Sequence, residues 1–185
     1  MTRPVVDAPV AARVAVLAAS GLGVVTALSL VAVLAVPSGP VFALVANLLV
    51  TLWVGAAVDA YSPAFGSRWF TVRTWEPALW RRLGVGVFGT ALRVIGWERM
   101  VTRRRGFDAT RSGLRSLDRH TRSSELCHLL VGSAGTVAVV VALLCRDVPA
   151  AVWFGGAVVV FHLYPVLLQR ILRARISRVV DGNEW

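Results

Sequence analysis

A carboxylate and an imidazole stand three residues apart at the start of a long apolar run. Glu125 and His128 occur in the segment Glu-Leu-Cys-His, and this spacing places both side chains on one face of a helix. A carboxylate beside an imidazole can orient the ring and raise its basicity, as a general base requires when it takes a proton from a hydroxyl. The alternative interpretation is structural: Glu125 would complement a helix dipole, and His128 would pack at the membrane boundary.

A second group of polar residues lies toward the C-terminus. His162, Gln169 and Arg173 follow one another at spacings of seven and four residues, so they share one stripe of a helix. Together with Arg170 and Arg175, they could hold a carboxylate or a phosphate through paired hydrogen bonds. The alternative is a positively charged anchor whose side chains reach the membrane surface.

The Glu-x-x-His spacing also occurs in di-iron helical bundles, which need a second copy and further inward-facing glutamates. The sequence has no second copy, so we expect no metal. Cys127 and Cys145 lie near opposite ends of one apolar run. They are too far apart on a helix to form a disulfide with each other.

The composition indicates a membrane protein. Hydrophobic residues make up 56% of the chain, and the mean hydropathy is +0.67. The net charge is +10, and every basic residue other than histidine is an arginine. Such a chain should meet an anionic surface. We expect that surface to be lipid headgroups and not nucleic acid, because the arginines lie between runs long enough to cross a bilayer.

Four apolar runs predict four transmembrane helices, which cover residues 14–36, 41–58, 126–145 and 150–169. At about 1.5 Å per residue, each approaches the ~30 Å hydrocarbon core of a bilayer. Lipid offers no hydrogen bonds to open backbone groups, so each run must be helical. Proline-containing turns should join the helices into two hairpins. The expected fold is a single all-α membrane domain over residues 1–185.

The segment between the hairpins, residues 59–125, is rich in arginine, whereas the turns inside the hairpins have almost none. Positively charged loops stay cytoplasmic, so we expect both termini on the cytoplasmic side of the plasma membrane. Residues 83–97 form an apolar stretch too short to span, which predicts an interfacial or re-entrant helix; a fifth span is the alternative. We expect residues 98–124 to form a solvated loop on anionic lipid heads or a headgroup-binding segment.

Three short blocks occur in order along the chain. Residues 69–76 read Trp-Phe-Thr-Val-Arg-Thr-Trp-Glu, residues 125–128 read Glu-Leu-Cys-His, and residues 165–175 read Pro-Val-Leu-Leu-Gln-Arg-Ile-Leu-Arg-Ala-Arg. They resemble the Trp-Phe-x-Val-Arg-x-Trp, Glu-Leu-x-His and Pro-x-x-x-Gln-Arg-Tyr-Asn-Arg-x-Arg segments of the glycosyl-4,4'-diaponeurosporenoate acyltransferases, small membrane enzymes of carotenoid synthesis. The resemblance covers about residues 60–178.

This resemblance implies transfer of a fatty acyl group to a sugar hydroxyl of a glycosylated carotenoid or similar lipid. It implies catalytic roles for Glu125 and His128. The residues that it suggests for substrate binding are Arg73, Trp75, Gln169, Arg170, Arg173 and Arg175, to which we add His162. The expected partners are membrane lipids, the lipid acceptor and the acyl donor, with the donor as a co-substrate and no cofactor. No serine or cysteine stands in a nucleophile-elbow setting, which favours direct transfer.

Two other classes of function remain as alternatives. In a membrane scaffold or lipid-binding protein without enzymatic activity, the arginines would only dock on the bilayer. A channel or transporter is less favoured, because the first two apolar runs carry no charge and no symmetrically broken helices are predicted.

Overall fold

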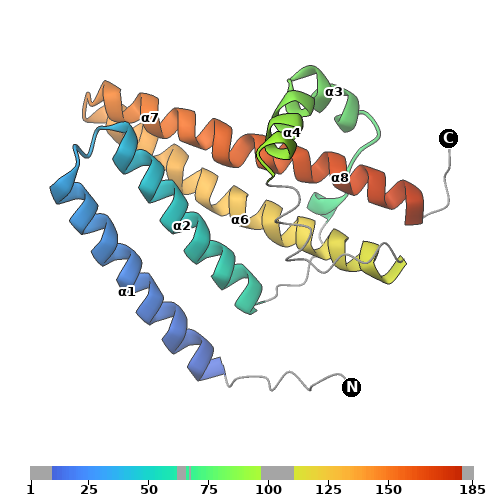
Figure 1. Cartoon of the computed structure of the whole chain (residues 1–185), viewed down its shortest axis with the longest axis horizontal. Coiled ribbons are helices and arrows are strands. Elements are labelled where there is room, and N and C mark those ends of the chain that lie inside the picture. Colours follow the sequence, from blue (N-terminus) through green and yellow to red (C-terminus); the bar gives the residue numbers. More distant parts are fainter. Residues whose placement is uncertain (1–9, 62–65, 67, 97–110, 181–185) are drawn as a thin grey trace.

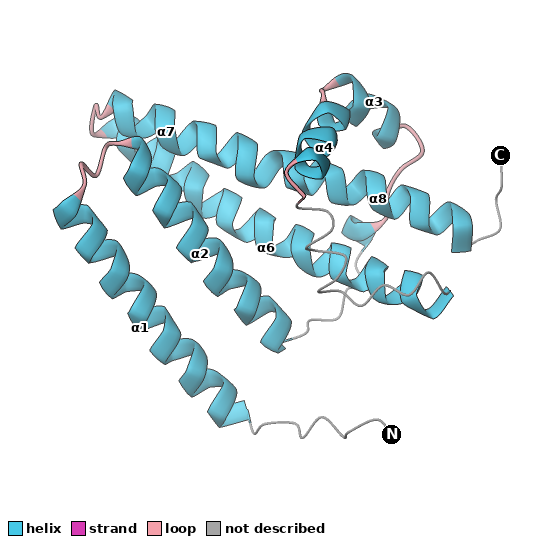
Figure 2. Cartoon of the chain, viewed as in Figure 1, coloured by secondary structure: helices cyan, strands magenta, loops and turns pink. Residues whose placement is uncertain are grey.

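The described part of the chain consists of helices joined by turns. The computed structural model describes residues 10–61, 66, 68–96 and 111–180. Its elements are, in chain order, α1 (Val10–Leu34), α2 (Pro40–Tyr61), η1 (Arg68–Phe70), α3 (Glu76–Arg82), α4 (Val85–Val94), α6 (Arg111–Leu144), α7 (Val148–Val158), η2 (Val159–Leu163) and α8 (Tyr164–Val180). These residues include no strand, as Figure 2 shows. The expected all-α fold class is confirmed.

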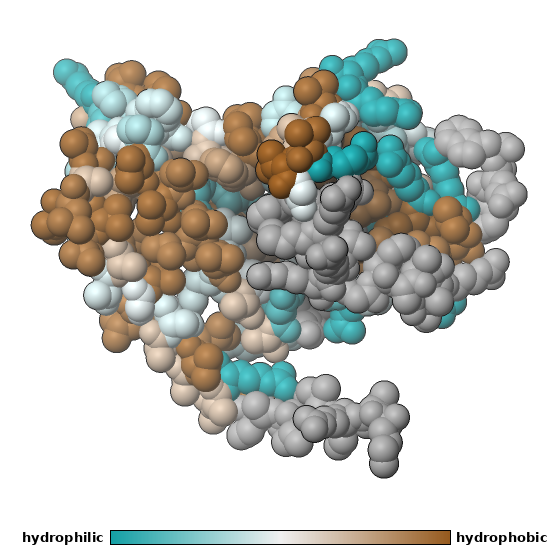
Figure 3. All heavy atoms as spheres, in the orientation of Figure 1, coloured by the Kyte–Doolittle hydropathy of each residue, from teal (hydrophilic) through white to brown (hydrophobic). Residues whose placement is uncertain are grey.

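Four helices are long and apolar enough to cross a membrane. They are Val10–Leu34, Pro40–Tyr61, Gly113–Leu144 and Val148–Val180. Large apolar side chains are exposed along them, for example Val33 and Leu144, and the left of Figure 3 is correspondingly dominated by hydrophobic surface. Contiguous apolar surface of this kind is suited to lipid and not to water. The chain is therefore a multi-pass membrane protein, as its apolar runs predicted.

The third spanning helix, α6, begins at Arg111 and not at Leu126. The solvated loop expected at 98–124 is therefore wrong for residues 111–124, which are helical; residues 98–110 lie outside the described residues. The early turns contain arginine and leucine, which favour helix, and an i, i+4 ion pair joins Arg122 Nε to Asp118 at 2.8 Å. These helical turns are polar, so they lack the run of hydrophobic residues by which a transmembrane helix is recognised in a sequence.

This extension changes the position of Glu125 on its helix. Glu125 lies well inside α6 and not at its first turn. The helix dipole acts mainly within the first and last turns. The structural alternative for Glu125, a charge that complements the start of a helix, therefore does not apply.

The fourth spanning helix runs from Val148 through α7, η2 and α8 to Val180, beyond the expected end at residue 169. Its middle segment, Val159–Leu163, is π-helical. Pro165 explains this widening, because a proline in a helix has no N–H to donate and its ring would clash with the carbonyl four residues earlier. A π-helical turn relieves that conflict by inserting one residue, and such turns are frequent at functional sites.

The spanning helices pack side by side, with α6 between α2 and the long α7–α8 helix (Figure 1). α1 packs against α2, where Trp53 Nε1 donates to the Leu17 carbonyl at 3.0 Å. A Cβ at Gly21 would lie 3.1 Å from the Trp53 ring, so glycine allows this close approach. Because α6 contacts α2 as well as α7, the grouping into two separate hairpins stays a prediction.

The two turns between spanning helices lie at the same end of the bundle (Figure 1). Ser38, in the α1–α2 turn, donates to Asp147 Oδ2 at 2.6 Å, and Asp147 Oδ1 caps α7 by accepting from the Ala150 amide at 3.1 Å. These hydrogen bonds, that from Ser38 above all, hold the pKa of Asp147 below its usual value. The hydroxyl–carboxylate contact joins the two turns to each other.

At the opposite end, α3 and α4 fold back onto α8. Val85 is fully buried against Leu167 and Ile171, and the Tyr164 hydroxyl donates to the Leu83 carbonyl at 3.0 Å. Gly84 adopts a φ of 80° in the tight turn between α3 and α4, a conformation that glycine reaches without steric cost.

Helix α4 also presents apolar side chains outward, with Val87 at 76% and Val94 at 80% exposure. An apolar face next to charged residues suits the membrane interface. The depth of the segment 83–97 in the membrane stays a prediction, and Trp97 lies outside the described residues.

The packing of α6 on α7 can be tested with two glycines. A Cβ at Gly135 would lie 2.6 Å from Val158 Cγ2, whereas a Cβ at Gly156 would have nothing within 4 Å. We expect Gly135→Ala to destabilise the protein by about 1–3 kcal/mol through overpacking. Gly156→Ala should leave the thermal midpoint in detergent unchanged or slightly raised, since alanine favours helix. Equal midpoints for the two variants would contradict the α6–α7 contact.

Candidate functional site

A buried carboxylate lies where α6 and α8 meet. Glu125 is fully buried, with 0% of its surface exposed. Its Oε1 accepts from Arg170 Nη1 at 2.8 Å, and its Oε2 accepts from Arg173 Nη2. Burying an unpaired carboxylate away from water would strongly destabilise the folded protein. The two arginines, one turn apart on α8, make the buried charge possible and lock α6 to α8.

Arg170 also binds a second carboxylate, Glu76 at the start of α3. Arg170 Nε and Nη2 donate to Glu76 Oε2 and Oε1 at 2.6 and 3.1 Å, a bidentate pair. Burial alone would raise the pKa of Glu76. The hydrogen bonds from Arg170 and from the Arg73 amide outweigh that effect and hold the pKa below its usual value.

The remaining donors of Arg170 bind the backbone of the preceding segment. Nη1 donates to the Trp69 carbonyl at 3.2 Å and Nη2 to the Thr71 carbonyl at 3.4 Å, and the guanidinium lies 5.7 Å from the centre of the Trp69 ring. A guanidinium has five N–H groups, and all five of Arg170 have partners within the protein. Arg170 therefore holds residues 69–76 against α8 and has no donor left for a ligand.

Arg173 differs from Arg170 in this respect. It is 3% exposed, and its guanidinium lies 5.7 Å from the centre of the Phe70 ring. Beyond the bond to Glu125, its Nε and Nη1 are buried with no hydrogen-bond partner among the described residues. Buried donors of a charged group are almost always satisfied. The open donors on Arg173 are therefore an exception that calls for an explanation, and a binding role for this residue stays a prediction.

Gln169 lies one turn before Arg173. Its Nε2 donates to Ser124 Oγ at 3.2 Å, and its Oε1 is buried without a partner within the described part of the chain. Gln169 and Arg173 together give α8 both an open acceptor and open donors beside Glu125.

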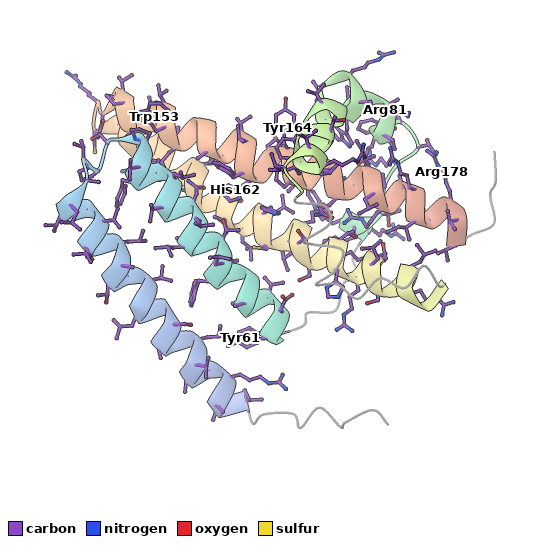
Figure 4. All side chains as sticks on the ribbon, in the orientation of Figure 1. Tyr61, Arg81, Trp153, His162, Tyr164 and Arg178 are labelled. Carbon is purple, nitrogen blue, oxygen red and sulfur yellow. The ribbon has the colours of Figure 1, made fainter. Side chains whose placement is uncertain are left out.

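Three polar side chains form a chain of contacts inside the bundle. His128 Nδ1 on α6 lies 3.4 Å from His162 Nδ1 in η2. His162 Nε2 lies 2.7 Å from Asn47 Oδ1 on α2. His162 is 2% exposed, and Figure 4 shows its side chain directed from the long C-terminal helix into the bundle, toward α2. The π-helical segment thus places an imidazole between two other helices.

The remaining sequence-predicted residues lie toward the surface. Arg73 is exposed and contributes its backbone amide to Glu76 at 3.1 Å. Trp75 is half-exposed, with its ring centre 6.2 Å from that of Trp80. Arg175 is exposed on α8. Binding roles for these three residues stay predictions.

Both oxygens of Glu125 are bound by arginines, and His128 Nδ1 faces His162. The expected orientation of the His128 ring by Glu125 stays a prediction. Across the described residues, no group of three or more His, Cys, Asp or Glu side chains is placed to hold a metal ion.

Sequence reasoning missed two members of this site. Glu76 closes the Trp-Phe-Thr-Val-Arg-Thr-Trp-Glu block, but nothing in that block indicated that its partner would be Arg170. Asn47 is the one amide side chain in the second apolar run. Polar residues inside a membrane are costly and often functional, and this signal could have identified Asn47.

The buried Glu125 can be tested by removing its charge. Glu125→Gln would leave Arg170 and Arg173 in a desolvated site without their shared counter-charge, so we expect a loss of about 3–5 kcal/mol in stability. The matched control is Asp118→Asn on the same helix, which breaks a partly exposed pair and should cost less than about 1 kcal/mol. Thermal unfolding in detergent measures both. A Glu125→Gln protein as stable as the Asp118→Asn protein would contradict the buried cluster.

Comparison with known proteins adds one match. Neither the curated proteins nor the solved structures include a match to this chain. A family model described as glycosyl-4,4'-diaponeurosporenoate acyltransferase matches residues 66–182, which include the site residues on α3, α6 and α8. This match extends over more than half of the chain. The chain therefore belongs to the glycosyl-4,4'-diaponeurosporenoate acyltransferase family.

Proposed function

We propose that the protein transfers a fatty acyl group to a sugar hydroxyl of a glycosylated carotenoid or similar membrane lipid. Membership in the family supports acyltransferase activity in carotenoid biosynthesis; the substrates and residue roles are our proposal. The observation that carries it is the pair of open, buried donors on Arg173. They lie beside Glu125, which stands one helical turn before His128 on α6.

His128 is the proposed general base. It takes the proton from the sugar hydroxyl while the hydroxyl oxygen attacks the acyl carbon of the donor. The new ester C–O bond forms, the bond from the acyl carbon to the donor's leaving atom breaks, and His128 passes the proton to that leaving atom. No net proton is gained or lost. A base of this kind contributes typically about 10²- to 10⁴-fold to the rate.

Arg173 is the proposed binding group for the anionic part of the acyl donor, with Gln169 beside it. An anion at this position would satisfy Nε and Nη1 of Arg173, which the described part of the protein leaves open. Because the guanidinium is shielded from water, its attraction for an anion is stronger than at an exposed site. In this proposal Arg170 supports the arrangement by fixing residues 69–76.

Direct transfer fits the surroundings of the nearest thiol. Cys127 packs in an apolar cluster with Val58 and Val131, and its Sγ lies 3.5 Å from the Thr51 carbonyl. A nucleophilic cysteine needs an environment that stabilises the thiolate. The apolar setting of Cys127 does not do this, which supports a mechanism without an acyl-enzyme.

We further propose a plasma-membrane location with both termini cytoplasmic and the active site at that face. The charge distribution supports this orientation, because positively charged loops stay cytoplasmic. The buried arginines and the α3–α4 pair lie at the end of the bundle away from the turn that contains Ser38 and the turn that contains Asp147. The acyl donor and the lipid acceptor would then meet at the level of the cytoplasmic headgroups.

His128 can be tested in lipid nanodiscs with a glycosyl-4,4'-diaponeurosporenoate as acceptor. Palmitoyl-CoA and dipalmitoyl phosphatidylglycerol serve as separate donor probes. We expect acyl ester product from the unmodified protein and at least about a 100-fold lower kcat for His128→Ala, because the general base is lost. His120→Ala is the matched control, since His120 is exposed earlier on the same helix.

Retained turnover in His128→Ala would exclude the base role. Absence of product from the unmodified protein with both donors would count against the proposed reaction and for the non-enzymatic scaffold, an alternative that the family match does not favour.

Arg173 can be tested in the same assay by Arg173→Lys. Lysine keeps the positive charge beside Glu125 but offers a single nitrogen in place of the guanidinium's three. We expect the KM for the donor to rise about 10-fold, roughly the cost of one lost charged hydrogen bond, with the KM for the acceptor unchanged. The matched control is Arg178→Lys in the last turn of α8, which should leave both constants unchanged. An unchanged donor KM in Arg173→Lys would exclude Arg173 as the donor-binding group.

A further inference from the structure

We infer that Asn47 is a positioning residue, which fixes the tautomer of His162 and through it the tautomer of His128. Asn47 lies on α2, outside the residues 66–182 that the family model matches. The inference rests on the proposed function, because it concerns the state in which His128 acts as a base. It gives α2 a part in the chemistry.

The orientation of the Asn47 amide determines which atoms donate and which accept in its contact with His162. Its Nδ2 donates to the Ala43 carbonyl, one turn earlier on α2, at 2.8 Å. The Oδ1 atom therefore points the other way, to His162 Nε2 at 2.7 Å. An amide oxygen only accepts hydrogen bonds, so the proton of the His162 ring must lie on Nε2.

The same logic passes from His162 to His128. An uncharged imidazole has one donor and one acceptor nitrogen, so a proton on His162 Nε2 leaves Nδ1 as an acceptor. His128 Nδ1, at 3.4 Å, must then be the donor. The lone pair of His128 is thereby placed on Nε2, the nitrogen that faces away from His162. In the other tautomer this nitrogen would carry the proton and could not act as a base.

The packing around His162 supports a fixed ring. A Cβ at Gly132 would lie 3.1 Å from His162 Cβ, so α6 and the π-helical segment approach closely at this position. Asn47 is 7% exposed on an otherwise apolar stretch of its spanning helix. A buried amide is costly unless it is hydrogen-bonded, and here both ends of the amide have partners. A rotated amide would set its oxygen against the Ala43 carbonyl and lose that hydrogen bond, so the observed orientation is favoured.

The test compares Asn47→Leu with Asn47→Asp in the nanodisc assay. Leucine cannot accept from His162, so we expect kcat to fall about 10- to 100-fold, as for other groups that orient a functional imidazole, with both KM values unchanged. A carboxylate also accepts from Nε2, so Asn47→Asp should retain most of kcat. Thr51→Val is the matched control, because Thr51 lies one turn along α2 and its hydroxyl donates to the Asn47 backbone carbonyl, at 2.5 Å.

A second measurement reads the tautomers directly and does not depend on activity. With ¹⁵N-labelled histidine in the full-length protein, we expect protonated Nε2 at His162 and protonated Nδ1 at His128. The Asn47→Leu protein should show a mixture. A thermal midpoint close to that of the unmodified protein would show that the variant folds.

Unchanged kcat in Asn47→Leu, under conditions where His128→Ala is inactive, would overturn this inference and leave the proposed function in place. A His128 ring that carries its proton on Nε2 in the unmodified protein would overturn the inference whether or not transfer is seen. If the unmodified protein transfers no acyl group, the proposed reaction fails, and the tautomers alone decide the role of Asn47.

Discussion

The buried carboxylate of Glu125 constrains the rest of the site. A charge with no exposed surface must be neutralised, and two arginines of α8 do so. Because Arg170 also binds Glu76, the same interaction fixes α3 and the segment before it. Three parts of the chain that are far apart in sequence are thus joined through one desolvated network. Removing one partner from a buried network of charges is strongly destabilising. The residues that form the site are therefore also needed for the stability of this region.

Arg170 and Arg173 are neighbours on α8, but they differ in how many of their N–H groups have partners within the protein. Arg170 directs every donor to the protein, whereas Arg173 keeps buried donors open among the described residues. The sequence alone predicted the same role, substrate binding, for both arginines. Both guanidinium groups contact Glu125 on α6 and an aromatic ring of residues 69–70, but only Arg170 also binds Glu76 and the carbonyls of Trp69 and Thr71. The arginine that holds the neighbouring segment and the arginine proposed to bind the donor are therefore one helical turn apart on α8.

The sequence predicted the spanning helices well, because lipid allows so few solutions for an uncharged apolar run. It failed at the polar turns before Glu125, since a charged helix has no hydrophobic pattern that separates it from a loop. It also did not predict the π-helical segment before Pro165, because a proline inside a helix is equally compatible with a kink. The shared stripe of His162, Gln169 and Arg173 stays a prediction. The partners of Arg173 and His162, Glu125 and Asn47, lie on other helices, so they required the tertiary structure.

The central claim is that the protein acylates the sugar of a carotenoid glycoside. Mass spectrometry of the carotenoids of the native host, with and without the gene, tests it most directly. We predict that loss of the gene removes one acylated glycosyl carotenoid and accumulates the same molecule without its fatty acyl group, and that the unmodified gene restores it. An unchanged set of carotenoids and glycolipids would contradict this claim.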